Sequence, residues 1–206
     1  MNDAEPPRPL ATTPDEGRAL LLEGNARYVA NAPRERDFSA GRHSRTLGQA
    51  PFATILSCSD SRVAPELAFD QGPGQLFVVR LAGHVVTREV LASLEFGAAI
   101  LGTSLIVVLG HSNCGAVLAT IASLRDGAEH SGHLPALVEA IAPAIQPVLA
   151  HPGDLEANAV HANVRHAVDR LRASSPLVAE RVATGTLGVT GGVYDLATGR
   201  VELDPA

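Results

Sequence analysis

The chain has 206 residues, which suits one domain or one domain with an arm. Hydrophobic residues make up 46% of the chain and provide for a packed core, whereas the net charge of −6 argues against a nucleic-acid partner. No apolar run approaches the roughly 20 residues that cross a bilayer, and the start of the chain lacks the apolar core of a signal peptide, so we expect a cytoplasmic protein without a membrane partner.

The first 50 residues are expected to form a tail and a helical arm. Residues 1–12 are polar and rich in proline, which predicts a disordered tail. Residues 13–50 are assigned to the arm. In it, Thr13 would cap a helix from Pro14 to Val29, and Glu16 would complete a capping box. We expect this helix to pack on the body of the protein or on a partner subunit.

Strands and helices alternate in residues 51–206, which predicts an α/β domain. A mostly parallel central sheet of about four to five strands, flanked by helices, accounts for this alternation. The expected strands are 52–57, 76–81, 105–109 and 187–193, the last of them taken as the final strand. The expected helices are 87–100, 114–124, two helical stretches after the polar loop at His130–His133, of which Asp154 caps the clearer, and one that starts at Pro176 and ends at Gly185.

Reactive side chains follow two of these strands. Cys58, Asp60 and Arg62 come after the first strand, and His111 and Cys114 come after the third. Ligands of open α/β sheets bind beyond the carboxyl ends of the strands. We therefore expect these five side chains to share one site.

Cys58, His111 and Cys114 are candidate zinc ligands. Zinc prefers thiolate and imidazole donors, and His111 and Cys114 are close enough in the chain to point at one ion across a strand-to-helix turn. The chain has two cysteines, so no third thiolate closes a structural site, and three protein ligands with an open position are typical of catalytic zinc. The alternatives are a disulfide, which a reducing compartment disfavours, and inert buried thiols beside a capping histidine.

Asp60 and Arg62 are a candidate catalytic pair. Two residues apart in an extended segment, they would project to the same side. Arg62 could hold the carboxylate with paired hydrogen bonds, which would keep Asp60 ionised and fix its direction. Asp60 could then accept a hydrogen bond from a zinc-bound water or hydroxide. The alternative is a structural salt bridge at the end of a strand.

The pattern Cys-x-Asp-x-Arg followed by His-x-x-Cys-Gly resembles the signature of the β-class carbonic anhydrases, and the resemblance extends from Glu23 to Asp195. It implies one Zn²⁺ per subunit on a parallel-rich fold. It also implies that subunits pair through their N-terminal helices, in a homodimer or a homotetramer. The residue roles that it implies are metal ligation by Cys58, His111 and Cys114, catalysis by Asp60 and Arg62, and a further role for Asp60 as a fourth metal ligand in an inactive state.

The resemblance implies that the substrate is CO₂ or bicarbonate. The reaction would be reversible hydration of carbon dioxide to bicarbonate and a proton, by attack of zinc-bound hydroxide. His84 is a candidate proton shuttle, although a hydrogen bond to a loop is the favoured alternative for it. Two other functions stay open: hydrolysis of carbon disulfide or carbonyl sulfide on the same scaffold, and a non-catalytic zinc-stabilised binding module.

Overall fold

The structure, a computed structural model, describes residues 8–39 and 41–205. The strands of these residues form one sheet: β1 (Ala53–Ser57), β2 (Leu76–Arg80), β3 (Leu105–His111), β4 (Gly188–Tyr194) and β5 (Val201–Leu203). Their order across the sheet is β2-β1-β3-β4-β5, with the first four parallel and β5 antiparallel to β4. The predicted fold class, a mostly parallel α/β sheet, is confirmed.

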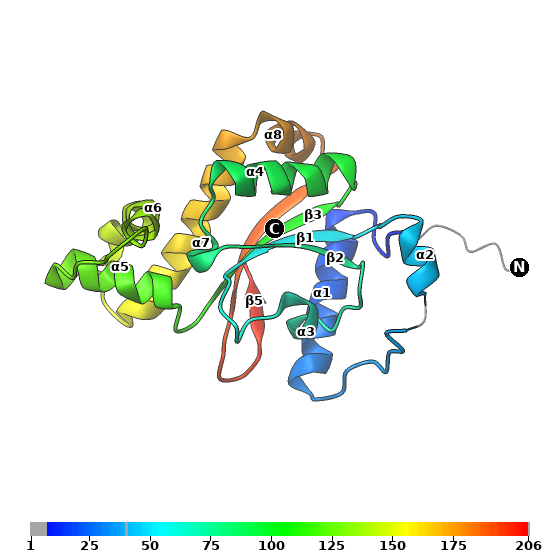
Figure 1. The fold of residues 1–206 in the computed structure, drawn as a ribbon, viewed down its shortest axis with the longest axis horizontal. Coiled ribbons are helices and arrows are strands. Elements are labelled where there is room, and N and C mark those ends of the chain that lie inside the picture. Colours follow the sequence, from blue (N-terminus) through cyan, green and yellow to red (C-terminus); the bar gives the residue numbers. More distant parts are fainter. Residues whose placement is uncertain (1–7, 40, 206) are drawn as a thin grey trace, which may run out of the picture.

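Helices cover both faces of this sheet. They are α1 (Pro14–Val29), α2 (Arg42–Thr46), α3 (Pro65–Ala68), α4 (Arg88–Glu95), α5 (Gly115–Asp126), α6 (Pro135–Ile145), α7 (Leu155–Ser174) and α8 (Pro176–Ala183). Figure 1 shows α4, α7 and α8 on one face and α1 and α3 on the other, while α5 and α6 extend beyond one end of the sheet. None of the described helices combines the length and the apolar character that crossing a bilayer would need.

Three details differ from the prediction. The short helices α2 and α3 have five and four residues, too few to show a helical period in the sequence. The helix expected over 87–100 is α-helical only to Glu95 and continues as one π-helical turn. The strand expected over 187–193 is not the last, because β5 follows it after a tight turn in which Thr198 N donates to Asp195 Oδ1. Three residues are too few for alternation to reveal β5.

The N-terminal helix α1 begins and packs as the sequence predicts. Glu16 N donates to Thr13 Oγ1 at 3.3 Å, and Thr13 N donates to Glu16 Oε2 at 3.1 Å, which completes the expected capping box. Buried Asn25 donates to the backbone oxygens of Ala68 and Gly199. The helix α1 therefore packs on the body of its own chain. The expected tail over residues 1–12 lies mostly outside the described residues, and the domain boundary at residue 50 stays a prediction.

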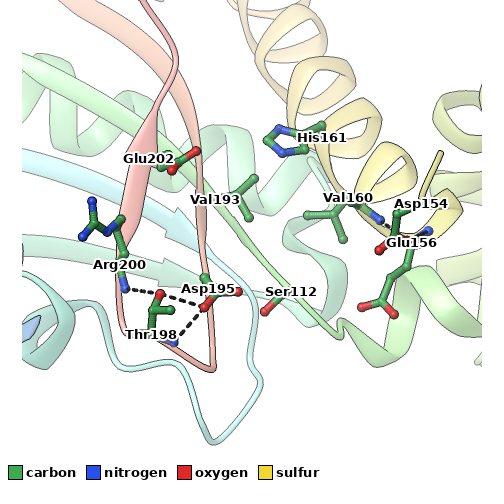
Figure 2. A pocket seen from close by; sticks show the side chains of 11 residues that line it. Ser112, Asp154, Glu156, Val160, His161, Val193, Asp195, Thr198, Arg200 and Glu202 are labelled. Carbon is green, nitrogen blue, oxygen red and sulfur yellow. Dashed lines mark hydrogen bonds between the residues drawn. The ribbon is translucent and has the colours of Figure 1, made fainter.

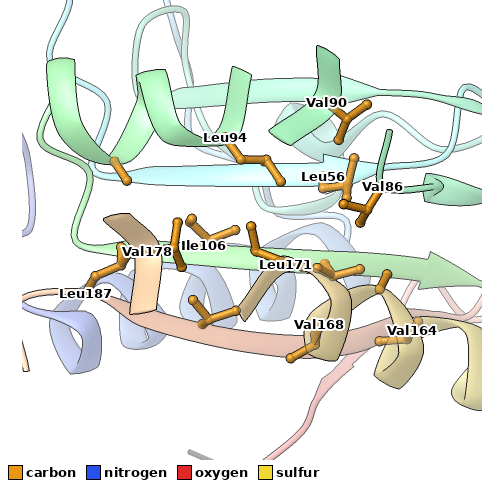
Figure 3. Packing of buried hydrophobic residues seen from close by; sticks show 14 residues of the cluster. Leu56, Val86, Val90, Leu94, Ile106, Val164, Val168, Leu171, Val178 and Leu187 are labelled. Carbon is orange, nitrogen blue, oxygen red and sulfur yellow. The ribbon is translucent and has the colours of Figure 1, made fainter. Parts of the chain in front are cut away.

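The core has a layer on each face of the sheet and a third cluster among α5, α6 and α7, and Figure 3 shows the layer under α4, α7 and α8. Successive residues of a strand point to opposite faces, so Leu56 joins this layer and Ile55 joins the one under α1 and α3. Ile106 and Val108 of β3 lie in the same layer as Leu56. The strands β1 and β3 are buried on both faces and pair in parallel. Their carboxyl ends therefore meet at one edge of the sheet.

Asp70 ties the segment after α1 to the domain. Its side chain is 2% exposed and accepts hydrogen bonds from Arg27 Nε at 2.6 Å, from the Arg36 guanidinium and from Arg34 N. Burial by itself raises the pKa of Asp70. The hydrogen bonds from Arg36, Arg27 and Arg34 outweigh burial and lower the pKa to about 2.

We expect Asp70→Asn to lower the free energy of unfolding by about 2–3 kcal/mol at neutral pH, because charge-assisted bonds to two arginines are lost. The pKa of Asp70 is lower in the folded state, so this contribution is complete above its ordinary value of 3.8 and disappears as the pH falls towards 2. Urea unfolding at both ends of this pH range measures the difference. If Asp70→Asn lowered the free energy of unfolding by the same amount at about pH 2, the stabilising role of the ionised carboxylate would be contradicted. The control is Glu23→Gln, which changes an exposed carboxylate on α1.

Candidate metal centre

The fold brings the two reactive segments to the same edge of the sheet. Ser57, the last residue of β1, pairs with Leu109 of β3, and the two strands run parallel. Cys58 directly follows β1, and His111 ends β3. Cys114 caps α5 after a short turn. Residues that lie far apart in the sequence thus lie next to one another beyond the strand ends.

Cys58, His111 and Cys114 form a buried group whose donor atoms all lie within 4.8 Å of one another. They are 5%, 0% and 0% exposed, and both cysteines are free thiols. His111 Nδ1 lies 2.9 Å from the Ser112 carbonyl oxygen, which makes Nδ1 the protonated nitrogen and leaves the lone pair on Nε2. His111 Nε2 is buried without a hydrogen-bond partner. A buried lone pair close to two sulfurs fits a zinc ion, whose preferred donors these are.

The two thiols differ in acidity. The hydrogen bond between them lowers the pKa of Cys58 and raises that of Cys114. The hydrogen bond from the Gly83 N–H adds to the lowering at Cys58. A thiolate is therefore stabilised at Cys58, and binding of a metal would displace the remaining proton.

Asp60 and Arg62 form the expected pair in an unexpected backbone conformation. They lie in a turn closed by Val63 N, which donates to Asp60 O at 3.0 Å, so the prediction of an extended segment is wrong. Within the turn, Arg62 N donates to Asp60 Oδ1 at 2.9 Å. The guanidinium donates from Nε to Oδ1 at 2.9 Å and from Nη2 to Oδ2 at 2.7 Å. These bonds from Arg62 hold the pKa of Asp60 well below its usual range, against the opposing effect of burial.

The Asp60 carboxylate lies beside the three donors and outside their group. Its Oδ2 atom is 4.0 Å from His111 Nε2, and both carboxylate oxygens accept hydrogen bonds from Arg62. Arg62 also donates to the backbone oxygen of Asn113 at 3.1 Å, in the turn between His111 and Cys114. The carboxylate is thus fixed relative to the histidine-bearing turn.

Two residues that the sequence analysis does not single out support these turns. Arg80, the last residue of β2, donates to the backbone oxygens of Cys58 at 3.1 Å and Asp60 at 2.7 Å. Glu156, in the first turn of α7, accepts from the backbone N–H of Asn113, whose φ of 59° is left-handed. A charged residue that ends an otherwise apolar strand is a signal that could have identified Arg80.

His84 is enclosed in the protein. Its ring is 0% exposed, and Nε2 lies 3.0 Å from Asn163 Nδ2. Burial lowers the pKa of His84 to about 4, so the ring is neutral at physiological pH. This geometry supports the alternative to a proton shuttle, in which the ring hydrogen-bonds to a neighbour.

A separate pocket of about 520 Å³ lies between the start of α7 and the β4–β5 hairpin. Figure 2 shows Asp154 and Glu156 on one side of it and Asp195 and Glu202 on the other, with Ser112 between them. None of the three buried donors lines it. Its lining is rich in carboxylates, in contrast to the thiol and imidazole donors of the buried group.

Comparisons with known proteins place the chain among the carbonic anhydrases. The sequence profile of the carbonic anhydrase family matches residues 53–201, a range that includes all five site residues. The chain is 42% identical to carbonic anhydrase 2 of Mycobacterium tuberculosis over 197 residues, which cover 93% of each chain.

Two solved structures resemble most of the chain. The β-carbonic anhydrase CcaA is 27% identical with a TM-score of 0.68, and the match covers 90% of this chain and 86% of that one. One of two tetrameric β-carbonic anhydrases from Sordaria macrospora is 23% identical with a TM-score of 0.71, and the match covers 93% and 98%. At that identity the second likeness shows the fold alone.

Proposed function

The chain belongs to the β-carbonic anhydrase family and is a carbonic anhydrase, and on this premise we propose that it catalyses the zinc-dependent, reversible hydration of carbon dioxide to bicarbonate and a proton. One observation carries the proposal. Three buried donors of the type zinc prefers lie together, with an ionised and clamped carboxylate at 4.0 Å from one of them.

In this proposal Cys58, His111 and Cys114 hold the metal. Zinc, when bound, supplies the Lewis acidity that lowers the pKa of water and makes hydroxide available near neutral pH. Two thiolates and the Nε2 lone pair would supply three protein ligands, the number typical of catalytic zinc, and would leave room for that water. The positive end of α5 lies at Cys114 and favours its deprotonation.

Asp60 and Arg62 orient the nucleophile. Arg62 uses Nε and Nη2 on the two carboxylate oxygens, and this bidentate clamp fixes the plane of the Asp60 carboxylate. Oδ1 accepts two bonds from Arg62, whereas Oδ2 accepts one and keeps a free lone pair, which can accept a hydrogen bond from the attacking water or hydroxide. That bond directs the oxygen's remaining lone pair towards the carbon of CO₂. In the described conformation Asp60 faces Arg62, so its role as a fourth ligand belongs to a different state of the site.

The assembly and the location are part of the proposal. The Sordaria macrospora structure is tetrameric, and we propose a homodimer or homotetramer for this chain as well. The free thiols Cys58 and Cys114, which a metal site needs reduced, suit the cytoplasm.

We expect activity to rise from about pH 7 into the mildly alkaline range. The thiolates of Cys58 and Cys114 offset the charge of the ion, and the ionised Asp60 carboxylate disfavours a further negative charge beside it. The pKa of the nucleophilic water should therefore lie above that of a site with three neutral imidazoles. Stopped-flow measurement of kcat/KM across this range tests the expectation. A flat profile between about pH 6 and pH 9 would contradict it.

The direct test of the function is stopped-flow CO₂ hydration by purified protein whose zinc content is measured on the same sample. Hydration at about pH 8.5 that scales with zinc content supports the proposal. A parallel assay with carbon disulfide and carbonyl sulfide separates the alternative reaction on the same scaffold. Zinc-loaded protein that is inactive on all three substrates would leave a binding module as the better description.

A further inference from the structure

Asn163 is a polar side chain on the buried face of α7. It is 3% exposed and lies between Val160 and Val164, which pack into the apolar core. Its side-chain nitrogen Nδ2 donates to the Gly83 carbonyl oxygen at 3.0 Å and contacts His84 Nε2 at 3.0 Å. An amide in such surroundings is costly unless it is hydrogen-bonded, so its two partners account for its presence there.

These two partners form the turn that faces Cys58. Gly83 N donates to Cys58 Sγ at 3.3 Å. Gly83 and His84 both have left-handed backbones, with φ of 65° and 45°. That conformation is uncommon for histidine, and it persists only where neighbours enforce it. A Cβ at Gly83 would lie 2.6 Å from Ile141 Cδ1, so the turn also has no space to shift towards α6.

We propose that Asn163 is a positioning residue for Cys58, because it holds the Gly83–His84 turn so that the Gly83 N–H points at the sulfur. The inference rests on the proposed function, in which Cys58 is a zinc ligand. A hydrogen bond from an amide draws charge from a thiolate and fixes its direction, which tunes how it donates to a metal. The hydrogen bonds of Asn163 described above go to Gly83 and His84 and to none of the three donors, so it acts through the turn.

The neutral state of His84 agrees with this arrangement. Because burial lowers its pKa to about 4, the ring has one nitrogen free to accept, and Nε2 lies where the second Asn163 N–H can reach it. One amide thus anchors both left-handed residues of the turn, the first through its carbonyl and the second through its ring.

The test compares Asn163→Leu, which keeps the branching of the side chain and removes both donors, with the wild type. In the cobalt-substituted proteins we expect the thiolate-to-cobalt charge-transfer band of the variant to move to lower energy, because the sulfur regains charge. We expect zinc affinity to fall roughly 10–100-fold, as when an outer-shell partner of a metal ligand is lost. The control is Thr103→Val, which removes a buried hydrogen bond to Thr54 at the opposite end of β1. This control variant should leave the charge-transfer band and the zinc affinity unchanged.

An unchanged band and affinity in folded Asn163→Leu would overturn the inference. If that variant does not fold, Asn163→Ser, which is too short to reach both partners, serves in its place.

A measurement on the wild type needs no variant: after loading with NMR-active cadmium, the Gly83 amide proton should couple to the metal through Cys58 Sγ. Absence of this coupling would refute the inference. Cobalt-loaded wild type without any thiolate band would instead overturn the metal site, and the inference with it.

Discussion

A Cys114→Ser variant should lose its metal and its CO₂ hydration together. Serine keeps the shape of the side chain but is not a thiolate donor, so two protein donors remain where zinc needs at least three. The loss of zinc affinity should exceed the roughly 10–100-fold that follows removal of an outer-shell partner. Hydration should fall to the spontaneous rate, because no other described group makes hydroxide available near neutral pH.

The control for Cys114→Ser is the wild type itself, stripped of metal with a chelator. Stripped wild type and variant should have the same residual rate, and added zinc should restore only the wild type. Circular dichroism of both apo proteins separates loss of metal from loss of fold. A variant that retains full zinc and more than a small part of its activity would contradict the assignment of Cys114.

An Asp60→Asn variant should keep its zinc and lose most of its activity. Asparagine preserves the size of the side chain but removes the charge that Arg62 clamps and one of the two acceptor oxygens. Because the three buried donors stay in place, metal content should be unchanged. We expect kcat to fall by about 10²-fold or more, in the range of lost proton-handling groups.

Two measurements make the Asp60 result specific. Asp169→Asn, an exposed carboxylate change on α7, should leave both zinc content and rate unchanged. Zinc analysis of Asp60→Asn shows whether the metal site is intact when the rate is measured. Full activity in Asp60→Asn would mean that this carboxylate takes no part in the reaction, and Asp60 with Arg62 would then be only a salt bridge of the turn.

The long elements of the fold could be predicted because their patterns repeat over several turns or pairs. The capping box at Thr13 and Glu16 located the start of α1, and continuous apolar runs located β1 and β3. The elements α2, α3 and β5 have between three and five residues, so no period could emerge. Their existence depends on tertiary contacts, such as the pairing of β5 with β4.

The three buried donors could be predicted to converge because parallel neighbouring strands end at the same edge. The conformation of the Asp60–Arg62 segment could not, since a turn closed by side-chain bonds and an extended strand end are equally compatible with alternating polar residues. Arg80 and Asn163 act through backbone atoms of residues distant in the sequence. The signal for Asn163 is an amide on an otherwise apolar helix face, which identifies a buried hydrogen bond without naming its partner.

Zinc-edge X-ray absorption of the purified protein tests the central claim most directly, because it reports the atoms that surround the metal. The account predicts one zinc per chain with two sulfur neighbours at about 2.3 Å, one imidazole nitrogen at about 2.0–2.1 Å and one lighter ligand. A zinc shell without sulfur, or a disulfide between Cys58 and Cys114 in the active protein, would contradict it.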